Sequence, residues 1–207
     1  MEQIKDTSTE AQILQVAERL FMERGYALTS TVDIAKEVGC NQALVHYYYR
    51  SKEKLFQKVF DEKSKLFIQA LLSPAPEGLT LEEILRQRIE LHFNIIQQSP
   101  NLPFLVVNEL LTNPNRINIL KQNLYRISVD AFGALQAILD KEYAAGKIRK
   151  VDARQLIINV VSLNVFTFLS LPIASEIFNL HNNQTQQTYL KERKEEIIKT
   201  ILNGIKA

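Results

Sequence analysis

The sequence predicts an all-α fold. Glycine and proline are scarce, at six each in 207 residues, so the turn signals that a many-stranded sheet protein requires are largely missing. Apolar residues recur at helical spacing in one segment after another, between residues that commonly cap helices. Hydrophobic residues make up 46% of the chain and charged residues 23%, which is typical of a folded globular protein.

The first helix is expected from about Thr9, which forms a capping-box pattern with Gln12. Gly25 is expected to end it, because glycine readily takes the left-handed conformation that follows a helix. One face of this helix is apolar and consists of Ile13, Ala17, Leu20 and Phe21. That face predicts a buried side.

Two short helices follow. Ser30 is a plausible N-cap, with Asp33 at the third helical position, where a carboxylate meets the positive end of the helix dipole. Gly39 stops this helix after about two turns, and Asn41 can cap the next one at Gln42. Two short helices joined by a glycine turn form a helix-turn-helix pattern.

The remaining helices are delimited by caps and prolines. A fourth helix is expected from Ser51 to about Leu72, and the SPAPEG segment at 73–78 is the expected boundary between two regions. Later helices are expected from Thr80 toward Ser99, between the prolines at 100–103 and 114, from 114 to 146, from 152, and over 190–205. Pro172 should kink or end the helix that begins near Asp152. The apolar run within it, 156–174, carries several polar residues and predicts a buried or interfacial helix rather than a membrane span.

The helix from Gln42 to Tyr49 divides into two faces. Val45 and Tyr49 lie four residues apart and are expected in the core, with Tyr48 at its border. The other arc holds Gln42, Ala43, Leu44, His46 and Tyr47. Such an arc suits the major groove of DNA, because glutamine can bond adenine and small apolar groups can meet a thymine methyl. Aromatic residues at helical spacing are more often simply core, so this stretch alone leaves both interpretations open.

Positive charge is concentrated next to this helix, although the net charge of the chain is only +2. Between residues 36 and 60 the cations outnumber the anions, with Lys36, Arg50, Lys52, Lys54 and Lys58 against Glu37 and Glu53. Lys52 stands at the expected start of the fourth helix, where its charge combines with free backbone amides to favour a phosphate.

The stretch from Gln12 to Glu62 resembles the DNA-binding domain of the tetracycline-repressor (TetR) family of bacterial transcription regulators. Three pieces carry the resemblance: ILQVAERLFMERGYALTS, TVDIAKEVGC and NQALVHYYYRSKEKLFQKVF. These pieces match the pattern of the family: an apolar first helix ending in F-x-x-x-G-Y, a second helix containing DIA, a glycine turn, an aromatic recognition helix and a basic SKE segment at the start of the fourth helix. The similarity covers about a quarter of the chain.

The resemblance implies a three-helix DNA-binding domain at 7–67 and a helical effector-binding and dimerisation domain at 74–207. It implies a phosphate contact for Thr31, base contacts for Gln42, Ala43 and Leu44, and a phosphate clamp for Lys52. It further implies that His46 and Tyr47 contact the DNA backbone or bases, and that Tyr48 borders core and phosphate. The sequence departs from the family pattern at Val32, where many members have a basic residue, and at His46, where tyrosine is commonest.

The C-terminal region is expected to bind an effector and to dimerise. The helix from 152 is apolar nearly all round and the last helix has one apolar stripe, which suits packing across a two-fold axis. Aromatic and polar residues that interrupt apolar faces are the candidate lining of an effector cavity: His92, Phe93, Phe104, Asn108, Tyr125, Phe132 and Asn164. Each of these could equally be a core or dimer contact. The region has no strong charge cluster, so a mainly apolar or amphiphilic effector is expected.

Two other functions compete with a ligand-responsive regulator, most simply a repressor. An enzyme is disfavoured because the three histidines are far apart in sequence, Cys40 has no evident base beside it, and glycine-rich phosphate loops are missing. A helical interaction protein that does not bind DNA is the second alternative. A single cysteine and a polar N-terminus favour the cytoplasm, and neither a cofactor nor a metal is expected.

Overall fold

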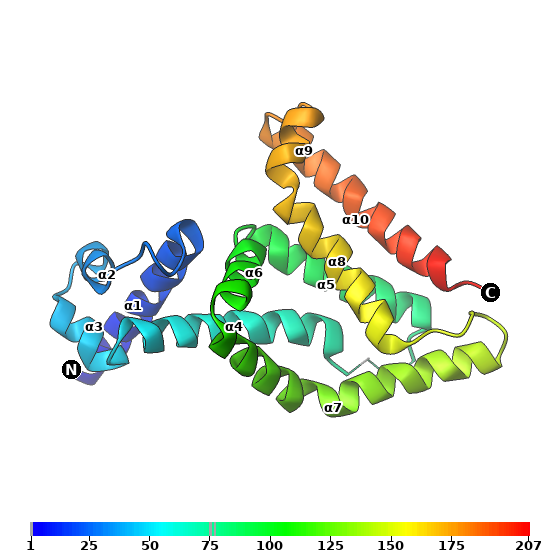
Figure 1. Ribbon diagram of the computed structural model, residues 1–207, viewed down its shortest axis with the longest axis horizontal. Coiled ribbons are helices and arrows are strands. Elements are labelled where there is room, and N and C mark those ends of the chain that lie inside the picture. Colours follow the sequence, from blue (N-terminus) through cyan, green and yellow to red (C-terminus); the bar gives the residue numbers. More distant parts are fainter. Residues whose placement is uncertain (1, 75, 77) are drawn as a thin grey trace. The chain divides into compact units, whose positions relative to one another are not determined.

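A computed structural model describes the backbone of residues 2–74, 76 and 78–207. The described backbone forms ten α-helices and no strand (Figure 1). The helices are α1 (Glu2–Arg24), α2 (Thr31–Val38), α3 (Gln42–Tyr49), α4 (Lys52–Leu72), α5 (Leu81–Gln98), α6 (Leu102–Thr112), α7 (Pro114–Ala144), α8 (Ala153–Leu169), α9 (Leu171–Ile177) and α10 (Asn183–Ile205). The all-α prediction is therefore confirmed.

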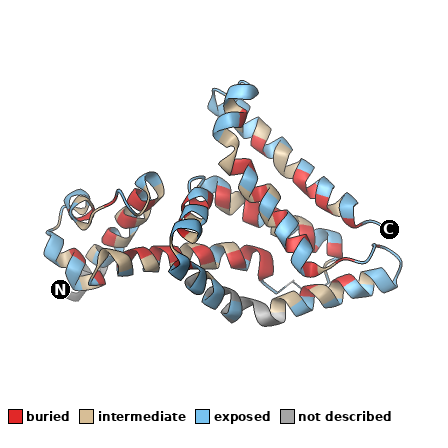
Figure 2. Cartoon of the chain, in the orientation of Figure 1, coloured by how far each residue is buried: buried red, intermediate tan, exposed pale blue. Residues whose placement is uncertain are grey.

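Contacts divide the chain into two compact units. The first consists of residues 1–64 and 104–117, and the second of residues 65–103 and 118–207. These are units of packing, and the functional division expected at residue 74 stays a prediction. Figure 2 shows that buried positions recur along one side of most helices, which is the pattern of helices that pack through one apolar stripe.

The first unit is organised around an aromatic cluster. Phe56 of α4 makes edge-to-face contacts with Phe21 of α1 and with Tyr26, at centroid distances of 5.0 and 4.9 Å. Aromatic pairs prefer this geometry because the positive edge of one ring meets the negative face of the other. Thr29 is buried beside the cluster, and its hydroxyl donates to the Leu20 and Gly25 carbonyls at the end of α1. The loop that leads into α2 is thereby fixed.

In the second unit, α5 packs against α8 and α10. The shared core contains Ile89, Phe93, Leu156, Val160 and Ile198. Five of the six residues in the predicted apolar stripe of the last helix are buried in this core, Leu190, Ile197, Ile198, Ile201 and Ile205, and the sixth, Leu202, is half-buried against it.

Two predicted helix breaks are confirmed, and the first helix starts earlier than expected. The first helix begins at Glu2, seven residues before the expected start. The break at 73–78 is confirmed, because α4 ends at Leu72 and α5 begins at Leu81. The break at Pro172 is also confirmed: α8 ends at Leu169, α9 starts at Leu171, and their axes differ by 60°. Proline lacks the amide hydrogen and its ring clashes with the preceding turn, so α8 cannot continue through it.

Within the described residues, no single helix is both long and apolar enough to cross a membrane. Only α8 and α9 taken together reach that length and composition, and they do so across the bend.

Candidate DNA-binding surface and effector region

The helix-turn-helix is built by strong local capping. Ser30 and Asp33 form a reciprocal capping box, in which the Asp33 amide donates to the Ser30 hydroxyl and the Ser30 amide donates to the Asp33 carboxylate, both at 3.1 Å. The hydrogen bonds from Ser30 hold the pKa of Asp33 below its usual value. Gly39 ends α2 with φ +77°, a conformation that costs glycine little, and the Asn41 side chain accepts from the Leu44 amide to start α3. The predicted caps Ser30 and Asn41 and the predicted stop Gly39 are confirmed.

The two predicted faces of α3 are also confirmed. Val45 and Tyr49 are buried, and Tyr48 is half-buried. The Tyr49 hydroxyl donates to the Glu10 carbonyl at 3.2 Å, and burial raises its pKa to about 12. Tyr47 is 62% exposed and packs edge-to-face on Tyr48. The helix therefore turns one aromatic residue into the core and another toward solvent.

The residues expected to contact DNA lie close together in the first unit. Gln42, Ala43 and His46 are exposed, whereas Thr31 and Leu44 are half-buried. The Gln42 amide nitrogen lies 2.9 Å from the Thr31 hydroxyl, so the start of α2 is joined to the start of α3. Whether these residues contact DNA stays a prediction at this point.

A tight turn joins α3 to α4. Arg50 has φ +62° and ψ −37°, and the Ser51 amide donates to the Tyr49 carbonyl across it. This is a γ-turn with positive φ, a strained conformation for a residue that has a β-carbon. The Ser51 hydroxyl accepts from the Lys54 amide, which confirms Ser51 as the cap of α4.

Lys52 is fixed by the loop that follows α1. Its ammonium group lies 4.3 Å from the centroid of the Tyr26 ring and 3.5 Å from the Ala27 carbonyl oxygen. A cation over an aromatic face is stabilised by the quadrupole of the ring. The side chain of Lys52, at the start of α4, is therefore held against the loop that follows α1.

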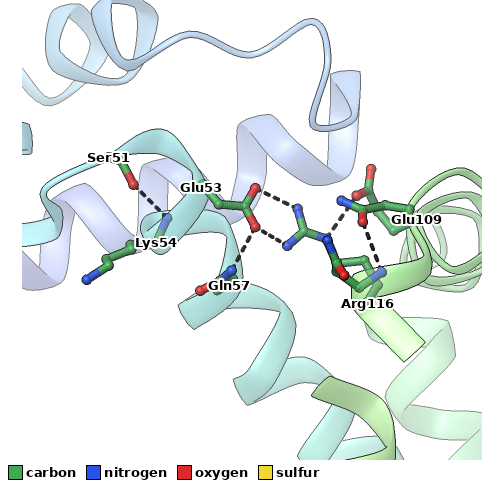
Figure 3. A network of polar contacts seen from close by, with 8 residues as sticks. Ser51, Glu53, Lys54, Gln57, Glu109 and Arg116 are labelled. Carbon is green, nitrogen blue, oxygen red and sulfur yellow. Dashed lines mark hydrogen bonds and ion pairs between the residues drawn. The ribbon is translucent and has the colours of Figure 1, made fainter. Parts of the chain in front are cut away.

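A buried arginine, Arg116, pairs with Glu53, the residue after Lys52, as Figure 3 shows. Arg116, at the start of α7, is fully buried and pairs through two nitrogens with the carboxylate of Glu53; the Nη2–Oε2 distance is 2.9 Å. Its Nε lies 3.3 Å from an oxygen of Glu109 in α6, and its guanidinium lies 4.5 Å from the centroid of Phe56. The hydrogen bonds from Arg116 lower the pKa of Glu53.

This network was not predictable from the sequence. Glu53 and Arg116 are 63 residues apart, so no helical spacing relates them. A carboxylate at the start of one helix and an arginine at the start of another are each ordinary surface features.

Three of the predicted effector residues lie together in the second unit. Asn164 of α8 donates from its amide nitrogen to the Ile89 carbonyl at 3.1 Å and to Nδ1 of His92 at 3.0 Å. His92 and Phe93 are buried, and burial lowers the pKa of His92 to about 4. The side-chain oxygen of Asn164 is buried and has no hydrogen-bond donor among the described residues. An uncompensated buried acceptor is unusual in a protein core.

The other four predicted effector residues are not buried in that core. Phe104 and Tyr125 are 66% and 63% exposed, Asn108 is exposed, and Phe132 is half-buried at the edge of the apolar core. Phe104 and Asn108 belong to the first unit. Helical spacing alone did not separate positions turned to solvent from positions in the interior.

Arg88 of α5 is a further polar group with an incomplete environment. Its Nη2 donates to the Ser73 carbonyl at 2.8 Å, while its Nη1 is buried without a partner among the described residues. Burial lowers the pKa of Arg88. The guanidinium lines a groove of about 210 Å³ together with Ala70, Ile84 and Leu91. The groove thus has Arg88 among apolar residues in its wall, and the unpartnered Nη1 is enclosed by protein atoms.

The capped α2–turn–α3 pair with its exposed second helix defines a helix-turn-helix protein of the DNA-binding class. Comparison with known families supports this class over two segments. Residues 13–59 match the family of bacterial regulatory proteins, tetR family, and residues 82–201, more than half of the chain, match the tetracyclin repressor-like C-terminal domain. The chain belongs to the TetR family of bacterial transcriptional regulators.

Individual relatives agree with this assignment. The chain is 27% identical to the fatty acid metabolism regulator protein of Bacillus subtilis (strain 168), over 76% of this chain and 82% of that protein. It is 25% identical to the negative regulator IcaR of the icaADBC biofilm operon in Staphylococcus epidermidis, over 65% and 71% of the two chains. These relatives are named as regulators of transcription or metabolism, and the chain is accordingly a transcriptional regulator.

Solved structures show the same fold. A TetR-family regulator from Marinobacter aquaeolei VT8 matches with a TM-score of 0.68 at 22% identity, covering all of this chain and 99% of that one. The hemolysin II regulator HlyIIR matches with a TM-score of 0.58 at 23% identity, over 88% and 97% of the two chains.

Proposed function

We propose that the protein is a ligand-responsive repressor that binds a pseudo-palindromic operator as a homodimer and leaves it when an effector binds. The observation that carries this proposal is the exposed face of α3, which presents Gln42, Ala43, His46 and Tyr47 beside the fixed ammonium group of Lys52. A helix of this kind fits the major groove, and a dimer aligns two copies with successive turns of the duplex. Such a regulator acts on the chromosome in the bacterial cytoplasm.

The proposed roles divide between anchoring and reading. Thr31 and Lys52 bind phosphates, because the hydroxyl and the ammonium group lie at the starts of α2 and α4, where backbone amides also favour an anion. Gln42, Ala43 and Leu44 read bases early in α3. His46 and Tyr47 contact bases or backbone one turn later, and Tyr48 contributes at the edge of the core.

We propose that dimerisation uses α8 and α10, the two long helices at the end of the chain. Ile158 and Phe166 of α8 are 58% and 67% exposed and lie eight residues apart, on one face of the helix. Large exposed apolar residues that share a face mark an interaction surface. A two-fold axis would bury these residues against the same helices of a second copy.

The proposed effector is small and mainly apolar or amphiphilic. His92, Phe93 and Asn164 supply a polar point within an apolar core, and the unsatisfied oxygen of Asn164 would accept a hydrogen bond from the ligand. Phe104, Asn108, Tyr125 and Phe132 stay predictions. The groove beside Arg88 favours an amphiphile with an acidic group over a purely apolar molecule.

Selection of binding sites from random duplex DNA tests the proposal. The expected result is enrichment of one pseudo-palindromic sequence. A screen of apolar and amphiphilic compounds for release of that DNA would then identify the effector. Release requires the ligand to bind the DNA-free state more tightly than the DNA-bound state. A selection that enriches nothing would favour a helical interaction protein instead.

A further inference from the structure

The amide group of Gln42 is held in one orientation by its two neighbours. Its nitrogen donates to the Thr31 hydroxyl oxygen at 2.9 Å and lies 3.4 Å from Nε2 of His46. A glutamine amide carries two hydrogens on nitrogen and acceptor capacity on oxygen. Both hydrogens therefore have an acceptor within the protein, one in α2 and one in α3.

The ring of His46 is oriented to receive the second hydrogen. Its Nδ1 lies 3.3 Å from the Arg50 carbonyl oxygen. A carbonyl can only accept, so Nδ1 carries the hydrogen, and Nε2 of the neutral ring is left as an acceptor. The chain of hydrogen bonds runs from Gln42 to His46 and on to the backbone of Arg50, with the same direction of donation at each step.

The carbonyl oxygen of Gln42 has no donor among the described residues, and the side chain is exposed. We infer that Gln42 reads the operator as a hydrogen-bond acceptor only, and that its base is one that presents an amino group in the major groove, adenine or cytosine. Thr31 and His46 are then positioning residues for this contact. The inference rests on the proposed binding of an operator by α3.

This mode differs from the common pairing of glutamine with adenine. In that pairing the amide accepts from N6 and donates to N7, so it uses both of its ends. Here donation to N7 would require Gln42 to release Thr31 or His46. Guanine and thymine present acceptors to the groove, O6 and O4, which face the lone pairs of the Gln42 oxygen and are disfavoured.

Thr31 gains a second role from the same geometry. Its oxygen accepts from Gln42, which leaves the hydroxyl hydrogen available for a phosphate. One side chain can therefore hold the phosphate backbone and fix the reading group together. Substituting Thr31 should change both the affinity for DNA and the base preference. Substituting a residue that only binds a phosphate would change the affinity alone.

The test begins with selections on the wild-type protein and on Gln42→Ala. The base pair read by Gln42 is the position whose preference disappears in Gln42→Ala. Every base pair presents one amino group to the major groove, from adenine or from cytosine, so the selection locates the contact and single-atom changes decide its mode. The lack of any position that depends on Gln42 overturns the inference. A selection without enrichment overturns the inference and the proposed function together.

In the second arm, single atoms of the selected base are changed and the affinity of the wild-type protein for each modified operator is measured. Removing the amino group of the base should weaken wild-type binding about 3- to 10-fold, the value of one hydrogen bond. If the base is adenine, replacing N7 with carbon should change affinity by less than about 2-fold, because an acceptor-only contact does not use N7. Equal losses from the two changes would show the bidentate mode and overturn the inference.

The third arm repeats the selection with Thr31→Val and His46→Phe combined, which removes both internal acceptors while keeping side chains of similar shape. The freed amide can rotate and donate as well as accept, so the preference at the Gln42 position should relax toward other base pairs. Preferences at positions contacted by neither Gln42 nor His46 serve as the control, since the loss of a phosphate contact lowers the affinity for all sequences alike. An unchanged preference at the Gln42 position would show that Thr31 and His46 do not set it.

Discussion

Arg116 and Glu53 form a two-point ion pair inside the first unit, although they stand 63 residues apart in the chain. The arginine is fully buried and the glutamate is partly exposed. Glu53 directly follows Lys52, the proposed phosphate anchor, and Arg116 opens α7. The pair thus links the start of α4, which follows the proposed DNA-reading helix α3, to segment 104–117 of the same unit.

Replacing Arg116 with methionine should lower the free energy of unfolding by about 3 kcal/mol, because Glu109 would remain buried without its partner. Urea unfolding at pH 7 measures the change. Arg154→Met is the matched control, since the Arg154–Asp152 pair is exposed and its loss should cost less than about 1 kcal/mol.

A second variant separates charge burial from packing in this network. Arg116→Met combined with Glu109→Leu removes the stranded carboxylate as well, so it should be more stable than Arg116→Met alone. If the double variant is instead less stable than Arg116→Met, the unpaired Glu109 carboxylate is not the source of the lost stability.

His92 should make stability depend on pH. Burial lowers its folded-state pKa to about 4 from an ordinary 6.5. Between these values the unfolded chain binds a proton that the folded chain does not, so protonation favours unfolding. Stability is therefore complete above pH 6.5 and falls as the pH drops toward 4, with a loss of about 2 kcal/mol between pH 7 and 5.

The variant His92→Gln isolates this effect, because glutamine can still accept from Asn164 but does not titrate over this range. Its free energy of unfolding should change much less between pH 7 and 5 than that of the wild type. Measuring above pH 5 avoids the range in which carboxylates with lowered pKa values, such as Glu53, also take up protons. Parallel pH curves for the two proteins would assign the dependence to other groups.

Local signals in the sequence were sufficient to predict the ends of α2 and the starts of α3 and α4, the helices that carry the proposed DNA-binding residues. Ser30, Gly39, Asn41 and Ser51 each act on backbone groups within a few residues, and all four form the predicted caps or stops. The faces of α3 followed from the helical period for the same reason. Such interactions depend on spacing along the chain, which the sequence displays directly.

Contacts between distant helices were not predictable in this way. Arg116 looked like one cation in a polar stretch, yet it is buried against Glu53 and Phe56. Phe104 was predicted to line an effector cavity and is largely exposed. The burial of either residue depends on which helix lies beside it, and this information is absent from the spacing of its own neighbours.

Arg50 occupies a strained position that glycine would relieve. At φ +62° a residue with a β-carbon is strained, whereas glycine is not. Glycine also makes the unfolded chain more flexible, which offsets part of this gain. The net effect of Arg50→Gly should be a rise of about 0.5 to 1 kcal/mol in the free energy of unfolding. Thermal unfolding measures the gain. Arg50→Ala removes the same charge but keeps the β-carbon, and an equal gain in both variants would trace the effect to charge.

Phe166→Glu should convert the proposed dimer to a monomer, because a charge placed at the centre of an apolar interface lacks both water and a counter-ion. Sedimentation at micromolar concentration measures the change. Tyr143→Glu is a suitable control, since Tyr143 is similarly exposed but lies near the end of α7. If both variants remain dimeric, the interface is elsewhere on the molecule.

Tyr47→Ala should weaken operator binding about 10-fold, as expected for the loss of one good base or backbone contact. The same change should cost less than about 1 kcal/mol of stability, because the ring is 62% exposed and its main contact is the edge of Tyr48. Titration of labelled operator and urea unfolding give the two values. Tyr49→Ala, on the buried face of α3, should reverse the pattern, since it opens a cavity in the core and costs about 3 kcal/mol or more of stability. If Tyr47→Ala unfolds the protein while the folded fraction keeps full affinity, the ring is structural and operator reading depends on other residues of α3.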